Sequence, residues 1–145
     1  MIEMSRKAIP YTPNRKPLSE LTVALVSTAG VHMKNQEPFE TGPLGDVSYR
    51  VIPGDVDLKD LTITHGAPKE HYDPTDAIEH DMNCMFPLDR LREMAKTGEI
   101  GGVSDRHWTL MGYTMRLNRL QQETLPALVG EIEKSRTDAV VLTAG

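Results

Sequence analysis

Histidines and acidic residues form the densest group of chemically versatile side chains in this sequence. The group comprises His65, His71 and Asp73, with His80 and Asp81 shortly after. Imidazole nitrogens and carboxylates bind zinc, iron or manganese, and they also act as general acids and bases. Three interpretations are therefore open: a metal site, a polar pocket for a charged substrate, or a solvated loop of turn and capping residues. Because the spacing matches no established metal motif, we expect no metal in this chain.

A second set of candidates follows two apolar segments with nearly the same sequence. Residues 24–30 read ALVSTAG, and residues 139–145 read AVVLTAG. Each segment predicts a buried strand of a parallel sheet that ends in a Thr-Ala-Gly turn. Open α/β sheets place their chemistry just beyond the carboxyl ends of such strands, so both turns are expected at one edge of the sheet. The candidates at these strand ends are Thr28, Gly30, His32, Thr143 and Gly145.

Other polar and reactive side chains lie outside these two turns. His65 follows a further short strand and is expected to line the same pocket. Arg106 could bind a substrate carboxylate in the bidentate way, although a surface arginine is the alternative. We expect Arg106 and His107 in a polar turn before Trp108. Cys84 has apolar neighbours, so we expect a small core residue and not a nucleophile.

The elements that must position these residues alternate between strands and helices. Strands are predicted at residues 21–27, 48–52, 61–64 and 139–142, and residues 100–103 form a strand or a turn. Residues 33–46 are predicted to be a loop, and residues 67–86 an irregular stretch. Strand, helix and strand in this order predict an α/β fold of the three-layer type. Its sheet is mainly parallel, with about four or five strands flanked by helices.

Two helices are predicted in the second half of the chain. The first covers residues 87–96, with Pro87 suited to its first position and Gly98 to its C-terminal cap. The second covers residues 113–135 and should be kinked or split at Pro126, which lacks an amide donor. Its apolar face consists of Leu117, Leu120, Leu125, Leu128, Val129 and Ile132.

Composition narrows the function classes. The chain has 145 residues, a formal net charge of −5 and one cysteine. The acidic balance argues against nucleic acid or an anionic membrane as partner, and the lone cysteine fits a reducing, cytoplasmic setting. Neither Thr-Ala-Gly turn is a phosphate-binding loop. Residues 1–17 contain three prolines and are expected to form an extended arm, followed by one domain over residues 18–145.

Four segments in combination resemble the selenoprotein B family of the glycine, sarcosine, betaine and D-proline reductases, and above all its D-proline reductase branch. They are residues 25–32 (LVSTAGVH), 64–73 (THGAPKEHYD), 81–94 (DMNCMFPLDRLREM) and 139–145 (AVVLTAG). The resemblance implies an oxidoreductase subunit for reductive carbon–nitrogen cleavage of D-proline or a glycine-type substrate. It also implies a partner subunit that carries a pyruvoyl group.

The resemblance implies a selenocysteine directly after Gly145, and therefore no catalytic residue within the chain itself. Since UGA encodes selenocysteine and an ordinary expression host reads it as a stop, we expect a truncated, inactive N-terminal part of the reductase domain with an incomplete sheet. The selenolate should lie near backbone amides of a glycine turn and near cations. His32, His65 and Arg106 are the candidates for that environment.

The residues alone also allow other functions. An α/β racemase or lyase-like enzyme with His and Asp as acid and base is one alternative. A small binding or assembly module without catalysis is the other. We also expect a homo-oligomer, since pairing between chains could cover an exposed sheet edge.

Overall fold

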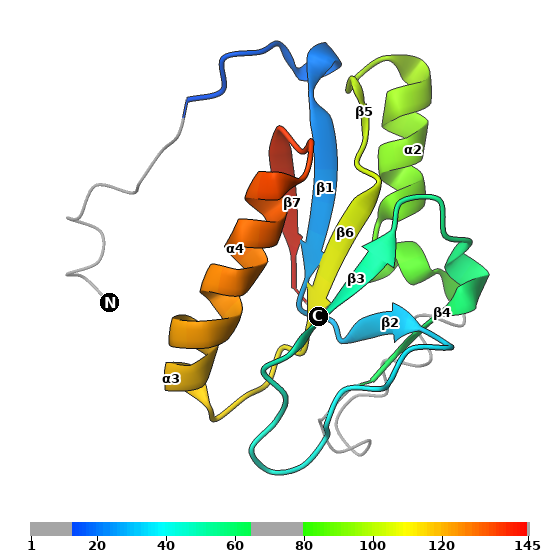
Figure 1. Ribbon diagram of the computed structural model, residues 1–145. Helices are drawn as coiled ribbons and strands as arrows, with labels where there is room; N and C mark the ends of the chain where they lie inside the picture. Colours follow the sequence, from blue (N-terminus) through cyan, green and yellow to red (C-terminus); the bar gives the residue numbers. More distant parts are fainter. Residues whose placement is uncertain (1–12, 65–79, 145) are drawn as a thin grey trace, which may run out of the picture.

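The strands form one main sheet with a helical layer on each face (Figure 1). The structure, a computed structural model, describes residues 13–64 and 80–144. The strands are β1 (Thr22–Ser27), β2 (Val31–Met33), β3 (Tyr49–Pro53), β4 (Leu61–Ile63), β5 (Gly102–Val103), β6 (Arg106–Leu110) and β7 (Ala139–Thr143). The helices are α2 (Leu88–Thr97), α3 (Leu117–Arg119), a π-helical turn (Leu120–Thr124) and α4 (Leu125–Lys134). Short 3-10 turns occur at Leu18–Glu20, Leu58–Asp60 and Met82–Cys84.

Strand β1 is the centre of the main sheet, as its continuous apolar run predicts. It pairs in parallel with β5 and β6 on one side and with β7 on the other. Strand β3 pairs with β6 in the antiparallel direction and makes the sheet mixed. The predicted α/β fold with a mainly parallel sheet is therefore confirmed.

The side chains of β1 alternate between two cores. Val23 and Leu25, with Leu21 directly before the strand, pack with α2 on one face of the sheet. Ala24 and Val26 pack with Trp108 and α4 on the other face. This alternation is the two-residue period of a strand, and it gives the predicted three-layer arrangement with α2 and α4 on opposite faces (Figure 1).

Helix α2 matches its prediction closely. Pro87 stands at the N-cap, one residue earlier than expected, and Gly98 forms the C-cap with a φ of +78°. The second helical segment begins at Leu117, four residues later than predicted, and its interruption is a π-helical turn directly before α4. Pro126 lies in the first turn of α4, where a missing N–H costs least. The wider π-helical turn before it accommodates the loss of the hydrogen bond that the proline cannot form.

After β1 the chain leaves the main sheet at Gly30 and forms a small antiparallel pair, β2 with β4. Gly30 has a φ of +67°, and a Cβ there would lie 2.1 Å from the Thr64 carbonyl oxygen. Only glycine allows this approach. Strand β2 is not among the predicted strands, because three-residue strands carry little periodicity.

Two local predictions are wrong. Arg106 and His107 begin β6 and do not lie in a polar turn. Cys84 is exposed and not part of the core, because it ends a short 3-10 turn whose buried member is Met82. Its apolar neighbours in the sequence point inward, but the cysteine does not.

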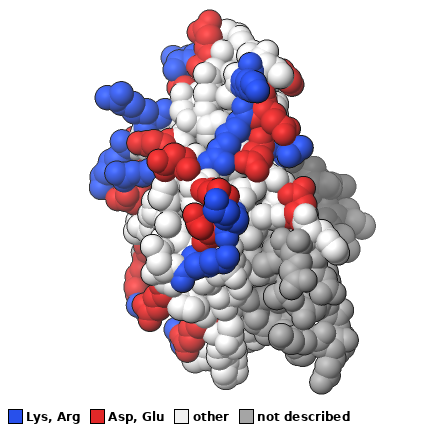
Figure 2. Space-filling view, turned by 90° about the vertical axis from the view of Figure 1, so that its right-hand side faces the viewer, with Lys and Arg blue, Asp and Glu red and all other residues white. Residues whose placement is uncertain are grey.

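The α2 side of the molecule carries charges of both signs. Figure 2 shows basic and acidic side chains interspersed there, without a large patch of one sign. Ion pairs such as Arg92–Asp89 and Arg90–Glu93 on α2 contribute to this pattern. Within the described residues, no helix has the length and apolar character needed to cross a membrane.

Candidate functional site

The carboxyl ends of β1 and β7 lie side by side at one edge of the sheet. We call this the β1–β7 edge, and it consists of Ser27, Thr28, Thr143 and the backbone carbonyl of Met85. Ser27 pairs with Thr143 in the parallel register, and the Thr28 amide donates to the Thr143 carbonyl oxygen at 3.0 Å. The predicted placement of both Thr-Ala-Gly segments at one edge is therefore confirmed for the residues that the structure describes.

The Met85 carbonyl binds both strand ends to the loop before α2. The Ser27 hydroxyl donates to it at 3.1 Å, and the Thr143 hydroxyl donates to it at 3.3 Å. Ser27 is fully buried and Thr143 is half-buried. Because a buried carbonyl has room for two donors, one oxygen fixes the ends of two neighbouring strands. Sequence reasoning did not single out Ser27 or Met85, since neither belongs to a motif.

The backbone amides of the first Thr-Ala-Gly turn all have acceptors within the protein. Besides the Thr28 amide, the Ala29 amide donates to the Ser27 hydroxyl at 3.2 Å. The Gly30 amide donates to the Leu110 carbonyl at 2.9 Å. In this conformation residues 28–30 have no free amide that could donate to an anion. The structure therefore does not support the expectation that this glycine turn binds the selenolate through its amides.

His32 holds the small sheet against the chain that follows β4. Its Nδ1 donates to the Met33 carbonyl at 2.9 Å, which leaves Nε2 of the neutral ring to accept from the Thr64 hydroxyl at 2.8 Å. The ring is buried and packs edge-on against Phe39, with centroids 6.1 Å apart. Both nitrogens are thus engaged, and His32 positions Thr64, the last described residue before His65.

Arg106 lies apart from the β1–β7 edge. It begins β6, three residues before Thr109, which is level with Ser27 in the register. Its exposed guanidinium lies 3.7 Å from the Glu131 carboxylate on α4. The structure therefore brings together Thr28, Gly30 and Thr143, with His32 on the adjoining small sheet, and leaves Arg106 outside this group.

The remaining predicted site residues are His65, His71, Asp73 and Gly145, and all four lie outside the described residues. Across residues 13–64 and 80–144, no three His, Cys, Asp or Glu side chains are grouped so that they could hold a metal ion. The polar segment that opened the sequence analysis therefore stays a prediction.

His107 has a structural position that its sequence context hid. It is fully buried, its ring packs edge-on against Phe86, and its Nδ1 accepts from the Leu25 amide at 2.9 Å. Burial, together with the nearby Arg92, lowers the pKa of His107 to about 4, while Asp105 opposes the shift. Its Nε2 has no hydrogen-bond partner among the described residues. A neutral, buried imidazole of this kind supports the sheet and does not face the β1–β7 edge.

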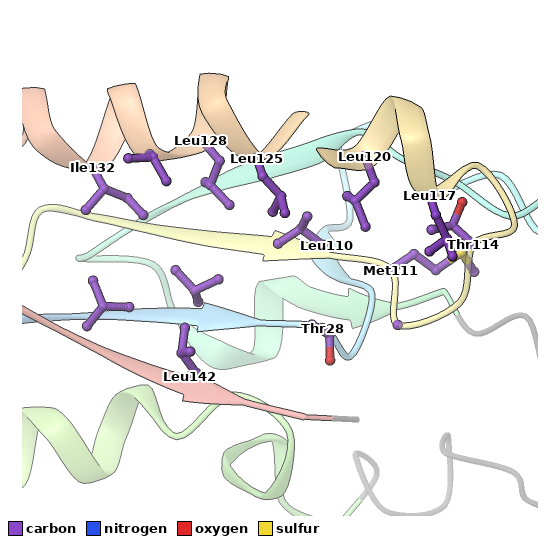
Figure 3. Close-up of a pocket in the computed structure, with 14 residues that line it drawn as sticks. Thr28, Leu110, Met111, Thr114, Leu117, Leu120, Leu125, Leu128, Ile132 and Leu142 are labelled. Atoms are coloured by element: carbon purple, nitrogen blue, oxygen red, sulfur yellow. The ribbon is translucent and has the colours of Figure 1, made fainter. Parts of the chain in front are cut away.

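An apolar groove of about 520 Å³ lies on the face of the sheet opposite α2. It runs between the helical segment 117–134 and strands β1, β6 and β7. Figure 3 shows Leu120, Leu125, Leu128 and Ile132 directed from the helices toward the sheet, with Thr28 and Leu142 opposite. The predicted apolar helix face thus borders a cavity that begins beside the β1–β7 edge.

Comparison with known proteins assigns the sequence of this chain to a family. The family described as glycine/sarcosine/betaine reductase selenoprotein B (GRDB) matches residues 2–145. D-proline reductase subunit gamma of Acetoanaerobium sticklandii is 41% identical over 135 residues, which cover 93% of this chain and 53% of that protein. No solved structure matches the chain significantly.

Two further relatives are more distant. The glycine reductase complex component B subunit gamma of Carboxydothermus hydrogenoformans is 31% identical over 139 residues, and that of Symbiobacterium thermophilum is 30% identical over 138 residues. In both cases the match covers 94% of this chain and 31% of the relative. The chain therefore spans about half the length of the first relative and about a third of the other two.

Proposed function

The chain belongs to the glycine/sarcosine/betaine reductase selenoprotein B family, and on that premise we propose that it is part of a selenocysteine-dependent reductase subunit. The reaction is the reductive cleavage of a carbon–nitrogen bond in a small amino acid or its N-methylated derivative. D-proline is the proposed substrate, because identity is 41% to the D-proline reductase subunit and 31% and 30% to the glycine reductase subunits.

The observation that carries this proposal is the pairing of Thr143 with Ser27 at the β1–β7 edge. We propose that the selenocysteine implied by the family resemblance directly follows residue 145, three residues beyond Thr143. That position lies at the carboxyl end of a parallel strand, where α/β enzymes carry their reactive groups. The selenolate would supply the nucleophile for cleavage of the carbon–nitrogen bond.

The residues of this chain then serve to hold that position. Ser27 and Thr143 share the Met85 carbonyl, and Thr28 donates to the Thr143 carbonyl, so the end of β7 cannot move independently of β1 and the α2 loop. Such immobilisation supplies orientation, which is a large part of catalytic rate enhancement. Because the amides of residues 28–30 are engaged, we assign anion stabilisation to other groups and keep His65 and His71 as candidates.

We also propose a partner subunit with a pyruvoyl group, which would activate the substrate amine. Support comes from the relatives, which are named as a gamma subunit and as component B subunits of a reductase complex. We place the enzyme in the cytoplasm, in line with the single cysteine and the acidic composition. Assembly into a homo-oligomer belongs to the same proposal.

The test is an activity assay on the full-length natural subunit with its pyruvoyl partner and a thiol reductant. D-proline, glycine, sarcosine and betaine are offered in turn, and the cleaved product is quantified. We expect cleavage of D-proline, lost when the residue after Gly145 is replaced by alanine. Turnover of none of the four, or turnover that survives the alanine replacement, would contradict the proposal.

A further inference from the structure

The two outer edges of the main sheet are treated differently by the chain. The outer edge of β3 is covered by the loop that follows β2: Gln36 Nε2 donates to the Val51 carbonyl at 2.9 Å. The Arg50 guanidinium reaches back to the Glu37 and Pro38 carbonyls. A sheet edge covered in this way is protected from pairing with other chains.

Strand β7 lacks this protection among the described residues. It pairs with β1 alone, and the sequence AVVLT contains neither a charge nor a proline. Since the Thr143 carbonyl accepts from β1, the alternation of a strand turns the amide and carbonyl of Leu142 toward the open side. The Leu142 side chain is 77% exposed. An apolar strand edge without charges is a template for pairing with further polypeptide.

The groove beside β7 is not covered by any of the described residues either. Leu117 on α3 is 58% exposed and Val129 on α4 is 50% exposed, although both belong to the apolar face of their helices. Leu142 borders the same cavity (Figure 3). The α2 face of the sheet, in contrast, is closed by a larger buried cluster that includes Phe86, Leu88 and Leu91. The uncovered apolar surface is therefore continuous from the edge of β7 to the outer side of α4.

We propose that this surface, the open edge of β7 together with the groove under α4, receives the part of a selenoprotein B subunit that this chain does not span. Support for this occupant comes from length: the chain covers 53% of the D-proline reductase subunit and 31% of each glycine reductase subunit. A further strand beside β7 would form hydrogen bonds with the backbone amide and carbonyl of Leu142. A helix or apolar segment over the groove would bury the side chains of Leu117 and Val129. The inference rests on the proposed membership in a longer subunit.

The remainder would then also order the catalytic region. Leu142 directly precedes Thr143 of the β1–β7 edge, and Thr28 of the same edge borders the groove. Docking there would hold β7 along its open edge, in addition to the pairing with β1 and the hydrogen bond from Thr143 to the Met85 carbonyl. The docking surface and the proposed reactive position are thus adjacent, yet they can be tested separately.

The test compares the 145-residue chain with the full-length subunit by amide hydrogen exchange and thermal unfolding. We expect the Leu142 amide to exchange at least about tenfold more slowly in the full-length subunit. Val129→Lys and Leu142→Lys should lower the melting temperature of the full-length subunit by about 5 °C or more and leave that of the short chain nearly unchanged. Leu18→Lys, at an exposed leucine elsewhere, is the matched control and should be silent in both.

Two results would overturn the proposal. One is equal exchange of the Leu142 amide and equal effects of Val129→Lys in both lengths of chain. The other is a short chain that sediments as a dimer and becomes a monomer with Leu142→Lys, since a second copy would then be the occupant. Neither readout requires turnover, so a failed activity assay with normal protection would reject the proposed reaction and leave the docking surface standing.

Discussion

The imidazole Nδ1 of His107 accepts a hydrogen bond from the backbone amide of Leu25 at 2.9 Å, in the middle of the sheet. Strand β1 pairs with β5 at Thr22 and Val23 and with β6 at Val26 and Ser27. Between these two stretches the ladder is interrupted, and the histidine side chain takes the place of a backbone carbonyl. A buried amide without an acceptor is costly in free energy, so His107 stabilises the central strand by accepting from the Leu25 amide.

The burial of His107 predicts a pH-dependent stability. The pKa of His107 is about 4 in the folded protein, against 6.5 for an exposed histidine. Between these values the unfolded chain binds more protons, so the stability present above pH 6.5 is lost progressively as the pH falls toward 4. The expected loss is on the order of 3 kcal/mol in the free energy of unfolding, measured by urea denaturation at several pH values.

A variant separates this titration from other acid effects. His107→Asn keeps a neutral acceptor near the position of Nδ1 and cannot be protonated in this range. Its unfolding free energy should change little between about pH 6.5 and 5, above the range in which aspartates with lowered pKa values lose their stabilisation. A wild-type pH profile in this variant would show that another group is responsible.

The approach of Gly30 to Thr64 predicts a large effect of a single methyl group. Gly30→Ala should destabilise the fold by more than about 2 kcal/mol, because it combines a left-handed φ with a steric clash against backbone. Gly98→Ala is the matched control: its φ is +78°, but no atom lies within 4 Å of the added Cβ. It should cost about 1 kcal/mol. Equal losses in denaturation experiments would rule out the clash.

The shared Met85 carbonyl predicts a non-additive pair of variants. Thr143→Val should cost about 1 kcal/mol, because the carbonyl keeps its other donor. Ser27→Ala should cost about 2 kcal/mol, because it also removes the acceptor of the buried Ala29 amide. The double variant leaves a carbonyl without a hydroxyl donor and should cost more than the sum, as a double-mutant cycle would measure. Simple additivity would mean that the two hydroxyls do not share this acceptor. In the full-length enzyme the double variant should also reduce turnover.

The position of Arg106 predicts that it does not act in the proposed reaction. Arg106→Ala should leave kcat/KM for D-proline within about twofold of the wild-type value in the full-length enzyme, because the guanidinium faces Glu131 on α4. An exposed ion pair of this kind also contributes little to stability. A loss of a hundredfold would return Arg106 to the candidate site.

Much of the fold could be predicted because its signals are local. The apolar run of β1, Pro87 and Gly98 around α2, and the repeated Thr-Ala-Gly segments each depend on neighbours in the sequence. What was missed depends on distant partners. His107 looked like a turn residue, since nothing near it reveals the Leu25 amide that it accepts from. Strand β2 exists only because β4 pairs with it thirty residues later.

The same reason limits prediction of the candidate site. Sequence placed Thr28 and Thr143 at one edge correctly, because their strands carry the same pattern. It missed the Met85 carbonyl, which is a backbone group, and grouped Arg106 with residues that the structure keeps apart from it. Backbone acceptors and the direction of exposed side chains leave no trace in residue types.

The most direct test of the central claim is mass spectrometry of the full-length natural subunit, digested and searched for the peptide that follows Thr143. The account predicts a peptide with the isotope pattern of selenium, with the selenium located on the residue directly after Gly145. A peptide at that position with neither selenium nor a cysteine in its place would contradict the account.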